Sequence, residues 1–377
     1  MAYDFDSLID RRAASSTKWV RYGADVLPFW VADMDFKSPP GLLAAVQARL
    51  RHGVLGYTDP PPVIEDAFIQ WLADRFGWSV PRDWLLWMPG VVPGLNLAGR
   101  VIGDPGQSIL IPVPVYHPFL SVPRYAGKQA IFVDLVRDNG RWVMDMDRLE
   151  DAIQPSTRGL LLCSPQNPTG RAYHRSELEP LVEFCLRHDL TLVSDEIHCD
   201  LLLDATASHT PTATLQPELR CISLFSPNKA YNIPGLSLGV AVIGDPVLRD
   251  AFQEALSGLG SGVSPLAFAA ALWAYTDRSD WLRALTAYLS RNRDLLEKTV
   301  DSLDGIEMTH VEATYLGWID VSALDLENAN AHFERFGIGL SDGGPFGGQG
   351  FQRFNFGCPR VTLKQGLSRL AEAVRSA

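Results

Sequence analysis

The sequence predicts an α/β fold, with a large domain that contains a mostly parallel sheet between helices and a smaller α+β domain. Through the middle of the chain, short continuous apolar runs alternate with amphipathic helical segments. This pattern is typical of parallel strands that helices cover on both faces. The chain has 377 residues, which exceeds one ordinary hydrophobic core, so we expect a second domain.

The N-terminal region predicts an arm rather than a compact unit. Residues 1–40 are irregular and rich in aromatic side chains, and residues 26–36 predict an extended apolar segment. Such a segment needs a surface to lie on, which is either its own domain or a partner subunit. Apolar residues at helical spacing then predict helices over 41–51 and 64–76, separated by a loop over 52–60 that contains glycines and a proline.

The middle of the chain predicts the sheet. Strands are expected at residues 108–112, 130–135, 159–163, 191–194, 221–225 and 238–243. The clearest helix between them covers residues 176–188, where Leu178, Leu181 and Val182 lie at helical spacing. Continuous apolar strands of this kind indicate burial on both faces of a sheet.

The pattern changes from about residue 245 onward. Helices are predicted over 281–303 and 363–374, and strands over 315–321 and 351–356. We therefore expect an N-terminal arm that forms part of the small domain (1–45), the large domain (46–280) and the C-terminal α+β domain (281–377).

Composition and charge exclude several classes of function. The chain carries 33 Lys and Arg against 44 Asp and Glu, a formal net charge of −11, which argues against nucleic acid or an anionic membrane as a partner. Residues 1–6 are acidic and precede no apolar signal segment, and no apolar run is long enough to span a membrane. The five cysteines form no CxxC pair and predict buried free thiols in a reducing compartment. We therefore expect a cytoplasmic protein.

Lys229 lies in an unusual position for a lysine. It follows the predicted strand 221–225 and precedes the apolar segment 236–243. An unpaired ammonium in a core costs several kcal/mol, so the side chain either reaches water or has a lowered pKa. A lysine with a lowered pKa is a nucleophilic amine. Position alone leaves both interpretations open.

Other polar residues also follow predicted strands. Tyr116, Asn167, Asp195 and His198 each come shortly after an apolar run. The carboxyl ends of strands are where open α/β sheets bind ligands, because the crevice of the fold lies there. We therefore expect these side chains to gather with Lys229 at one edge of the sheet.

The chain lacks GxGxxG after a strand, a Walker A sequence, HExxH, a GxSxG elbow and any cluster at metal spacing. The turn Val91–Gly94 precedes the predicted helix 96–102 and offers free N–H groups to an anion. A lysine, a carboxylate, a hydrogen-bond donor and an anion-binding helix start are together what a pyridoxal phosphate site needs. Structural alternatives stay open: Asp195 could cap a turn, Asn167 could form an Asx turn and Lys229 could be solvated.

Motifs along nearly the whole chain resemble the fold-type I pyridoxal-phosphate enzymes, the aspartate aminotransferase superfamily. Within that group the chain is similar to the MalY/PatB branch of cystathionine β-lyases. The motifs, in the family's order, are residues 27–36 (LPFWVADMDF), 53–57 (GVLGY), 114–119 (PVYHPF), 167–171 (NPTGR), 194–198 (SDEIH), 226–232 (SPNKAYN) and 353–356 (RFNF).

The resemblance implies a role in cofactor binding for each matching residue. Lys229 would be the Schiff-base lysine and general base, Asp195 would pair with the pyridinium nitrogen, and Tyr116 would stack on the ring. Asn167, joined by His198, would hydrogen-bond the ring oxygen. The phosphate would be held by Val91, Val92, Ser226 and Asn228, with Tyr57 reaching it from the neighbouring subunit of a homodimer.

For the substrate, the resemblance implies an amino acid whose α-carboxylate is bound by Arg353, beside Trp30 and Asn167. An arginine fork fits a carboxylate with two hydrogen bonds. The chain departs from the family's pattern at Gln166, Asn228 and residues 357–360 (GCPR). Because these positions adjoin the catalytic residues, they bear on phosphate contacts and substrate choice.

The activity that the resemblance implies is α,β-elimination from a cysteine S-conjugate such as cystathionine. The alternatives are an aminotransferase or another pyridoxal-phosphate reaction on the same residues, and a regulatory protein that binds pyridoxal phosphate. The residues named above serve the first steps of all such reactions. The sequence therefore leaves the thiol side of the substrate and the pathway open.

Overall fold

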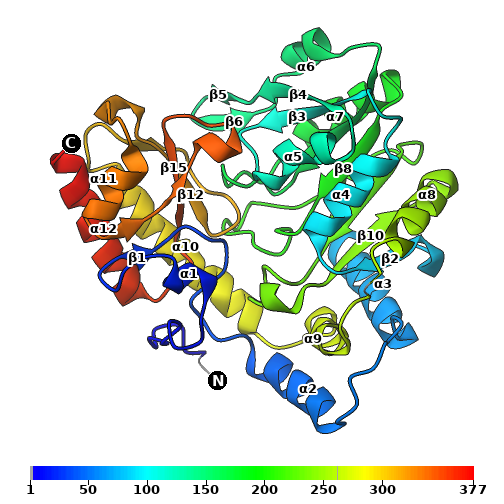
Figure 1. The fold of residues 1–377 in the computed structure, drawn as a ribbon, viewed down its shortest axis with the longest axis horizontal. Helices are drawn as coiled ribbons and strands as arrows, with labels where there is room; N and C mark the ends of the chain where they lie inside the picture. Colours follow the sequence, from blue (N-terminus) through cyan, green and yellow to red (C-terminus); the bar gives the residue numbers. More distant parts are fainter. Residues whose placement is uncertain (1–2, 261) are drawn as a thin grey trace.

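The computed structural model describes residues 3–260 and 262–377, so the first two residues of the acidic N-terminus lie outside the described residues. Its centre is a seven-stranded sheet with the order β2-β10-β9-β8-β7-β3-β4 (Figure 1). The strands are β2 (Leu85–Met88), β3 (Ser108–Val113), β4 (Gln129–Asp134), β7 (Thr157–Cys163), β8 (Thr191–Asp195), β9 (Cys221–Phe225) and β10 (Gly239–Ile243). All neighbouring pairs are parallel except those of β10, which runs antiparallel to β9 and β2. The predicted mostly parallel sheet is confirmed.

Apolar side chains point alternately to the two faces of the sheet along each strand, which explains why helices cover both faces. In β3, Ile109 and Ile111 pack on one face with α4, α5 and α8, whereas Leu110 packs on the other face with α6 and α7, because successive side chains of a strand point to opposite sides. Helices α3 and α9 cover the β2–β10 end of that second face. The helices of this part are α2 (Pro40–Arg51), α3 (Pro62–Phe76), α4 (Val91–Val101), α5 (Pro118–Tyr125), α6 (Met146–Ala152), α7 (Arg175–Arg187), α8 (Pro246–Ser257) and α9 (Pro265–Tyr275).

Helix α4 begins earlier than the sequence pattern predicts. The predicted turn over Val91–Gly94 is in fact the first turn of α4, which starts at Val91. Gly90 has φ of 118°, a conformation that side-chain-bearing residues rarely adopt, so the chain reverses there directly after β2. Pro93 is tolerated because it lies in the first turn, where its missing N–H has no helical partner to lose.

The C-terminal part forms a four-stranded sheet with the order β11-β12-β15-β14, beside the large sheet in Figure 1. Its elements are α10 (Trp281–Val300), β11 (Glu307–Met308), β12 (Leu316–Asp320), α11 (Ala329–Arg335), β13 (Ile338–Gly339), β14 (Ser341–Asp342), β15 (Phe351–Asn355) and α12 (Arg360–Arg375). The N-terminal arm contains α1 (Thr17–Val20) and β1 (Leu27–Pro28), and β1 pairs with β13 in parallel. Phe29 of the arm stacks on Phe354 with ring centroids 4.3 Å apart. The arm thus packs on its own chain.

A short hairpin of β5 (Val136–Asp138) and β6 (Arg141–Val143) completes the fold. All five cysteines are buried and free, which confirms the prediction of buried free thiols. Of the helices in residues 3–260 and 262–377, none combines the length and apolar character that a membrane crossing requires.

Candidate active site

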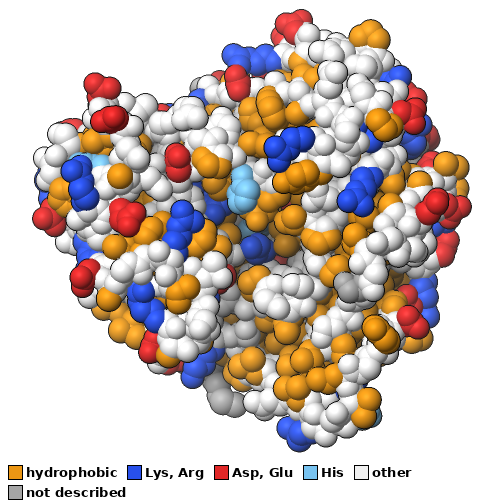
Figure 2. Space-filling model, viewed as in Figure 1, with side chains coloured by type: hydrophobic (Ala, Val, Ile, Leu, Met, Phe, Trp, Pro, Cys, Tyr) orange, Lys and Arg blue, Asp and Glu red, His pale blue; other side chains and the backbone are white. Residues whose placement is uncertain are grey.

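A cavity of about 210 Å³ lies at the carboxyl edge of the large sheet, where the predicted residues gather. Figure 2 shows a hollow near the centre of this face, with basic side chains inside it. The predicted site residues that line the cavity are Val91, Val92, Tyr116, Asn167, Asp195, His198, Asn228 and Lys229. They come from the start of α4, the last residue of β8 and the loops after β3, β7, β8 and β9. Because the carboxyl ends of these strands meet at one edge of the sheet, residues up to about 140 positions apart in the chain line the same cavity.

Lys229 lies in the turn after β9 and its Nζ donates a hydrogen bond to the carbonyl oxygen of Ala32, at 2.7 Å. Burial and the nearby Arg353 cation lower the pKa of Lys229 to about 8, whereas Asp33 and Asp195 act in the opposite direction. At pH 7 about a tenth of the Lys229 side chains are therefore neutral amines, and a neutral amine is a nucleophile and a base.

Asp195 is the last residue of β8 and only 4% of it is exposed. Burial raises the pKa of this carboxyl to about 7, although the N–H of Ile197 and the Lys229 side chain favour its charged form. A buried carboxylate without a paired cation favours a positively charged partner in the cavity. Nearby, burial holds the pKa of His198 well below its usual range, and its Nδ1 has no hydrogen-bond partner within the described chain.

Arg353 determines which way the Asn167 amide points. The guanidinium donates from Nη1 to Asn167 Oδ1 at 3.0 Å and from Nη2 to the Trp30 carbonyl at 2.7 Å. Because Oδ1 of Asn167 accepts this bond, its NH₂ group is the side that remains for a ligand. Arg353 and Trp30 are not in the cavity lining themselves. Burial lowers the pKa of Arg353 to about 10, a value at which it still carries its charge near neutral pH.

The first turn of α4 forms one wall of the cavity. No side chain caps this helix end among the residues described, so the N–H groups of Val91 and Val92 face a ligand rather than a cap. Asn228 Oδ1 is also without a partner in the described residues. Ser226 is not in the lining, because its hydroxyl donates to the Leu238 carbonyl at 2.6 Å and accepts from the Asn228 N–H at 3.1 Å.

These features fit pyridoxal phosphate. An amine with a lowered pKa, a buried carboxylate, an amide NH₂ and an uncapped helix start match its aldehyde, ring nitrogen, ring oxygen and phosphate respectively. The buried polar atoms without partners, His198 Nδ1 and Asn228 Oδ1, lie on residues of the same cavity lining. Orphaned polar atoms cost free energy unless a ligand or water meets them.

Two departures from the family's pattern differ in their consequences. Gln166 is buried away from the cavity, where its Nε2 donates to the Pro114 carbonyl at 2.6 Å and its Oε1 accepts from the N–H and hydroxyl of Thr169. It therefore fixes loops rather than contacting a ligand. Asn228, in contrast, lines the cavity.

Some lining residues were missed by sequence reasoning. Ala32, Ile197 and Ser237 all line the cavity. Ile197 and Ser237 lie close to predicted residues in the sequence, and the positive φ of Ser237, 48°, marks a sharp turn that apolar periodicity does not reveal. Ala32 lies in the arm and reaches the cavity only through the packing of distant segments.

Tyr57 lies apart from this cavity. It is fully exposed and belongs to the loop between α2 and α3, where it lines a separate surface hollow together with residues 262–266. The predicted contact of Tyr57 with a cofactor phosphate therefore requires a second copy of the chain.

Comparison with known proteins identifies the family. The model of the family "Aminotransferase class I and II" matches residues 24–370. The chain belongs to this aminotransferase family. Within the family, it is 36% identical to cystathionine beta-lyase PatB of Bacillus subtilis, over 98% of this chain and 100% of PatB. The family expected from the motifs is confirmed.

Solved structures of this aminotransferase family agree with the fold. The crystal structure of OvoB superposes with a TM-score of 0.97 and 42% identity and covers 100% of both chains. Cystalysin from Treponema denticola, which contains a pyridoxal 5'-phosphate cofactor, has a TM-score of 0.93 and 31% identity over 100% of both chains. The observed α/β architecture is thus that of the family.

Proposed function

We propose that this chain is a pyridoxal-phosphate-dependent C–S β-lyase that cleaves a cysteine S-conjugate by α,β-elimination. The observation that carries the proposal is the grouping of Lys229, Asp195 and Asn167 around one cavity, in a chain similar over 98% of its length to a cystathionine beta-lyase. With one water molecule consumed, the conjugate yields its thiol, pyruvate and ammonia.

The cavity residues offer a contact for each part of the cofactor ring. Lys229 Nζ would bond the aldehyde carbon, Asp195 would pair with the ring nitrogen, and Tyr116 would stack on the ring face. The NH₂ group of Asn167 would donate to the ring oxygen, joined by His198. These assignments are supported by the place of all five side chains in the cavity lining.

The phosphate would lie at the start of α4. The N–H groups of Val91 and Val92 supply hydrogen bonds and the positive end of the helix dipole. Asn228, in the loop that carries Lys229, would donate the second hydrogen of its Nδ2, because the first goes to the Leu238 carbonyl at 3.2 Å and its Oδ1 can only accept. Ser226 would act indirectly, because its hydroxyl oxygen accepts a hydrogen bond from the Asn228 N–H at 3.1 Å. A direct bond from Ser226 to the phosphate would require its hydroxyl to break its bond to the Leu238 carbonyl.

Bound pyridoxal phosphate supplies an electron-withdrawing ring that stabilises negative charge at the substrate α-carbon. The protein residues bind the substrate and move its proton. Arg353 holds the α-carboxylate, with Trp30 beside it, and the Lys229 amine takes the α-proton. A base with a pKa of about 8 is matched to this transfer near neutral pH. Departure of the thiolate with the electron pair of the C–S bond completes the elimination.

A product assay over a panel of cysteine S-conjugates tests the proposal. We expect free thiol and pyruvate from cystathionine or from a related conjugate, without an added keto acid. An aminotransferase would instead leave the C–S bond intact and produce a sulfur-containing keto acid only when an amino acceptor is present. A protein that binds pyridoxal phosphate without turning over any conjugate would support the regulatory alternative.

Replacing Arg353 with lysine is expected to raise KM by about 30-fold, with a smaller change in kcat. The variant keeps the charge but loses the fork, at a cost of roughly 2 kcal/mol for a charged hydrogen bond. The control is Arg171→Lys, because Arg171 is also a buried arginine but pairs with Glu177 and Glu312, whereas Arg353 donates to Asn167 of the cavity lining. Steady-state kinetics measure both; an unchanged KM in Arg353→Lys contradicts the assignment.

We further propose a homodimer in which Tyr57 contacts the partner's phosphate. Exposed apolar side chains surround Tyr57 along the chain, including Leu50, Val54, Leu55 and Val63. Figure 2 shows hydrophobic side chains gathered at the lower end of this face, where α2 lies in Figure 1. A contiguous exposed apolar surface is typical of an interface.

Mixing inactive variants tests this arrangement. Tyr57→Ala and Lys229→Ala homodimers are each expected to be impaired, whereas exchange of their subunits restores about a quarter of the wild-type activity, because half of the sites are in mixed dimers and one of each mixed pair is intact. Tyr125→Ala, at another exposed tyrosine, is the control and is expected to stay active by itself. Absence of recovery after verified subunit exchange contradicts the shared site.

The domain division is likewise proposed at residues 1–45, 46–280 and 281–377. Its support is a hydrophobic core that joins arm residues such as Phe29 and Met34 to Leu316, Phe354 and Leu370 of the C-terminal part, and this core also takes in Leu201, Tyr231 and Ala270 of the middle part. A cytoplasmic location is consistent with the five free, buried cysteines, since thiols stay reduced in that compartment.

A further inference from the structure

The segment Trp30–Phe36 of the arm has no regular secondary structure, yet it lies against the site. Its carbonyl groups are held by side chains from other parts of the chain instead of by a strand ladder. Asn355 Nδ2 donates to the carbonyls of Val31 and Asp33 at 2.6 and 2.7 Å. Asn232 Nδ2, at the end of the Lys229 loop, donates to those of Met34 and Phe36, both at 2.8 Å. The carbonyls of Val31, Asp33, Met34 and Phe36 are thereby fixed in direction.

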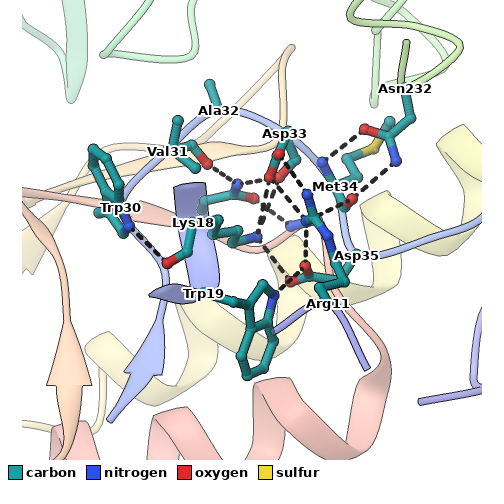
Figure 3. Close-up of polar contacts among 12 residues, drawn as sticks. Arg11, Lys18, Trp19, Trp30, Val31, Ala32, Asp33, Met34, Asp35 and Asn232 are labelled. Atoms are coloured by element: carbon teal, nitrogen blue, oxygen red, sulfur yellow. Dashed lines mark hydrogen bonds and ion pairs between the residues drawn. The ribbon is translucent and has the colours of Figure 1, made fainter. Parts of the chain in front are cut away.

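Between these anchors lies the carbonyl of Ala32. It accepts a hydrogen bond from Lys229 Nζ at 2.7 Å and another from the Tyr315 hydroxyl at 2.9 Å. Tyr315 is buried, so its bond to Ala32 is shielded from water, whereas the bond from Lys229 lies part-buried at the cavity wall. Figure 3 shows Ala32 in the loop between Val31 and Asp33.

An ion-pair cluster fixes the segment from its other side (Figure 3). Arg11 donates to both oxygens of Asp33, at 3.0 and 2.7 Å, and to Asp35 at 2.6 Å. Lys18, which is fully buried, donates to Asp35 at 2.8 Å and to the Asp33 carbonyl at 3.1 Å. Trp19 Nε1 adds a bond to Asp35 at 2.8 Å. Two cations and two carboxylates balance, so no charge is left unpaired.

We propose that the Ala32 carbonyl is the acceptor that holds the Lys229 amine whenever this amine is not bonded to the cofactor, and that Arg11 and Lys18 are positioning residues for it. The proposal deepens the proposed function and rests on it for the catalytic meaning of Lys229. Arg11 and Lys18 act through Asp33 and Asp35, since Asp33 follows Ala32 directly in the chain. A held amine keeps one orientation toward the substrate proton between the two halves of the reaction, where a free lysine side chain samples many rotamers.

The hydrogen bond also affects the charge of Lys229. An acceptor stabilises the ammonium form, so loss of the Ala32 contact lowers the pKa of Lys229 further. The other groups that face the amine are Arg353, Asp33 and Asp195, with neutral His198 nearby. A variant that removes a charge from the cluster would change the field of Asp33 as well. The test therefore needs a substitution that preserves charge and changes geometry alone.

Arg11→Lys is such a substitution, because lysine cannot span two carboxylates as the guanidinium fork does. The measurement is the pH dependence of Lys229 acetylation in the full-length protein freed of cofactor, followed by mass spectrometry of its peptide. We expect the midpoint for Lys229 to fall by about half a unit or more. The matched control is Arg137→Lys, since Arg137 also bridges two carboxylates, Glu307 and Asp320, both at 3.2 Å, outside the cavity lining. Its Lys229 midpoint is expected to equal that of the wild type.

Trp19→Phe is a second variant that keeps all charges and removes only the indole bond to Asp35. It is expected to shift the midpoint in the same direction by a smaller amount, so the proposal remains testable if Arg11→Lys folds poorly. An unchanged Lys229 midpoint in folded Arg11→Lys, or an equal shift in Arg137→Lys, overturns the proposal. Acetylation is measured without substrate, so it does not depend on lyase activity. If these shifts occur in a protein that lacks lyase activity, the proposed function is refuted and the proposal for Ala32 stands.

Discussion

Lys229→Ala is expected to lower kcat/KM for cleavage of a cysteine conjugate by about 10⁴-fold or more. In the proposed mechanism the variant loses both the group that bonds the cofactor and the base that takes the α-proton, and a positioned base alone contributes about 10²- to 10⁴-fold. Its pKa of about 8 explains why this lysine, rather than an exposed one, can act near neutral pH. Borohydride reduction should fix pyridoxal phosphate to the Lys229 peptide in the wild type and to no peptide in the variant.

The matched control is Lys128→Ala. Lys128 is buried whereas Lys229 is partly exposed, but the pKa of Lys128 is likewise lowered by burial and its Nζ likewise donates to a backbone carbonyl, that of Arg100 at 3.2 Å. It lies outside the cavity lining, so we expect the variant to keep its activity and its cofactor. Cofactor fixed at another lysine in Lys229→Ala, with activity retained, would refute the assignment.

Asp195→Asn is expected to have opposite effects on activity and on stability. The amide cannot keep a ring nitrogen protonated, so kcat should fall by roughly 10²- to 10³-fold, as for loss of one electrostatic stabiliser. In the cofactor-free protein, however, the carboxylate is buried without a paired cation, and its replacement should raise Tm at pH values above about 7. Asparagine can still accept the hydrogen bond from the Ile197 N–H.

The pH dependence of this gain follows from linkage. Burial raises the pKa of Asp195 from 3.8 to about 7 in the folded chain. The unfolded chain therefore loses this proton first as pH rises, and the wild type loses stability between about pH 4 and pH 7, by as much as about 4 kcal/mol. Asp195→Asn does not lose stability in this pH range. The amount by which its Tm exceeds that of the wild type should therefore be larger at pH 8 than at pH 5.5.

Glu312→Gln gives the contrasting case. Although Glu312 is half-buried, Arg171 and the Ala172 N–H hold the pKa of its carboxyl below the ordinary value. Its contribution to stability is present above its unfolded pKa and is lost as pH falls. The substitution should therefore lower Tm at pH 8 and leave kcat unchanged. Thermal denaturation of both cofactor-free variants checks the signs; a lower Tm for Asp195→Asn at pH 8 would contradict the unpaired carboxylate.

Much of the site could be predicted because it follows strand ends. Asn167, Asp195 and Lys229 each lie within four residues of the end of a buried parallel strand. Parallel strands place their carboxyl ends at one edge, so sequence order alone brings these side chains close. The bounds of the predicted strands also agree, since they differ from the observed ones by at most two residues, whereas α4 begins five residues before the predicted helix.

The remainder depends on contacts that no local pattern carries. The antiparallel direction of β10 leaves no trace in an apolar run, because burial on both faces looks the same in either direction. Ala32 is a small apolar residue whose backbone carbonyl, not its side chain, meets Lys229. The bond between Arg353 and Asn167 joins residues 186 positions apart. Such features appear only when the arm, the large sheet and the C-terminal sheet are placed together.

The most direct test of the proposed activity is the balance of products from a single conjugate. The wild-type protein, loaded with pyridoxal phosphate, is incubated with cystathionine or with the best conjugate of the panel, without any keto acid. Thiol, pyruvate and ammonia are measured over time. The proposed elimination predicts equal amounts of all three, over many turnovers, and none with Lys229→Ala. Formation of a keto acid that retains the sulfur, with turnover only after an amino acceptor is added, would contradict it.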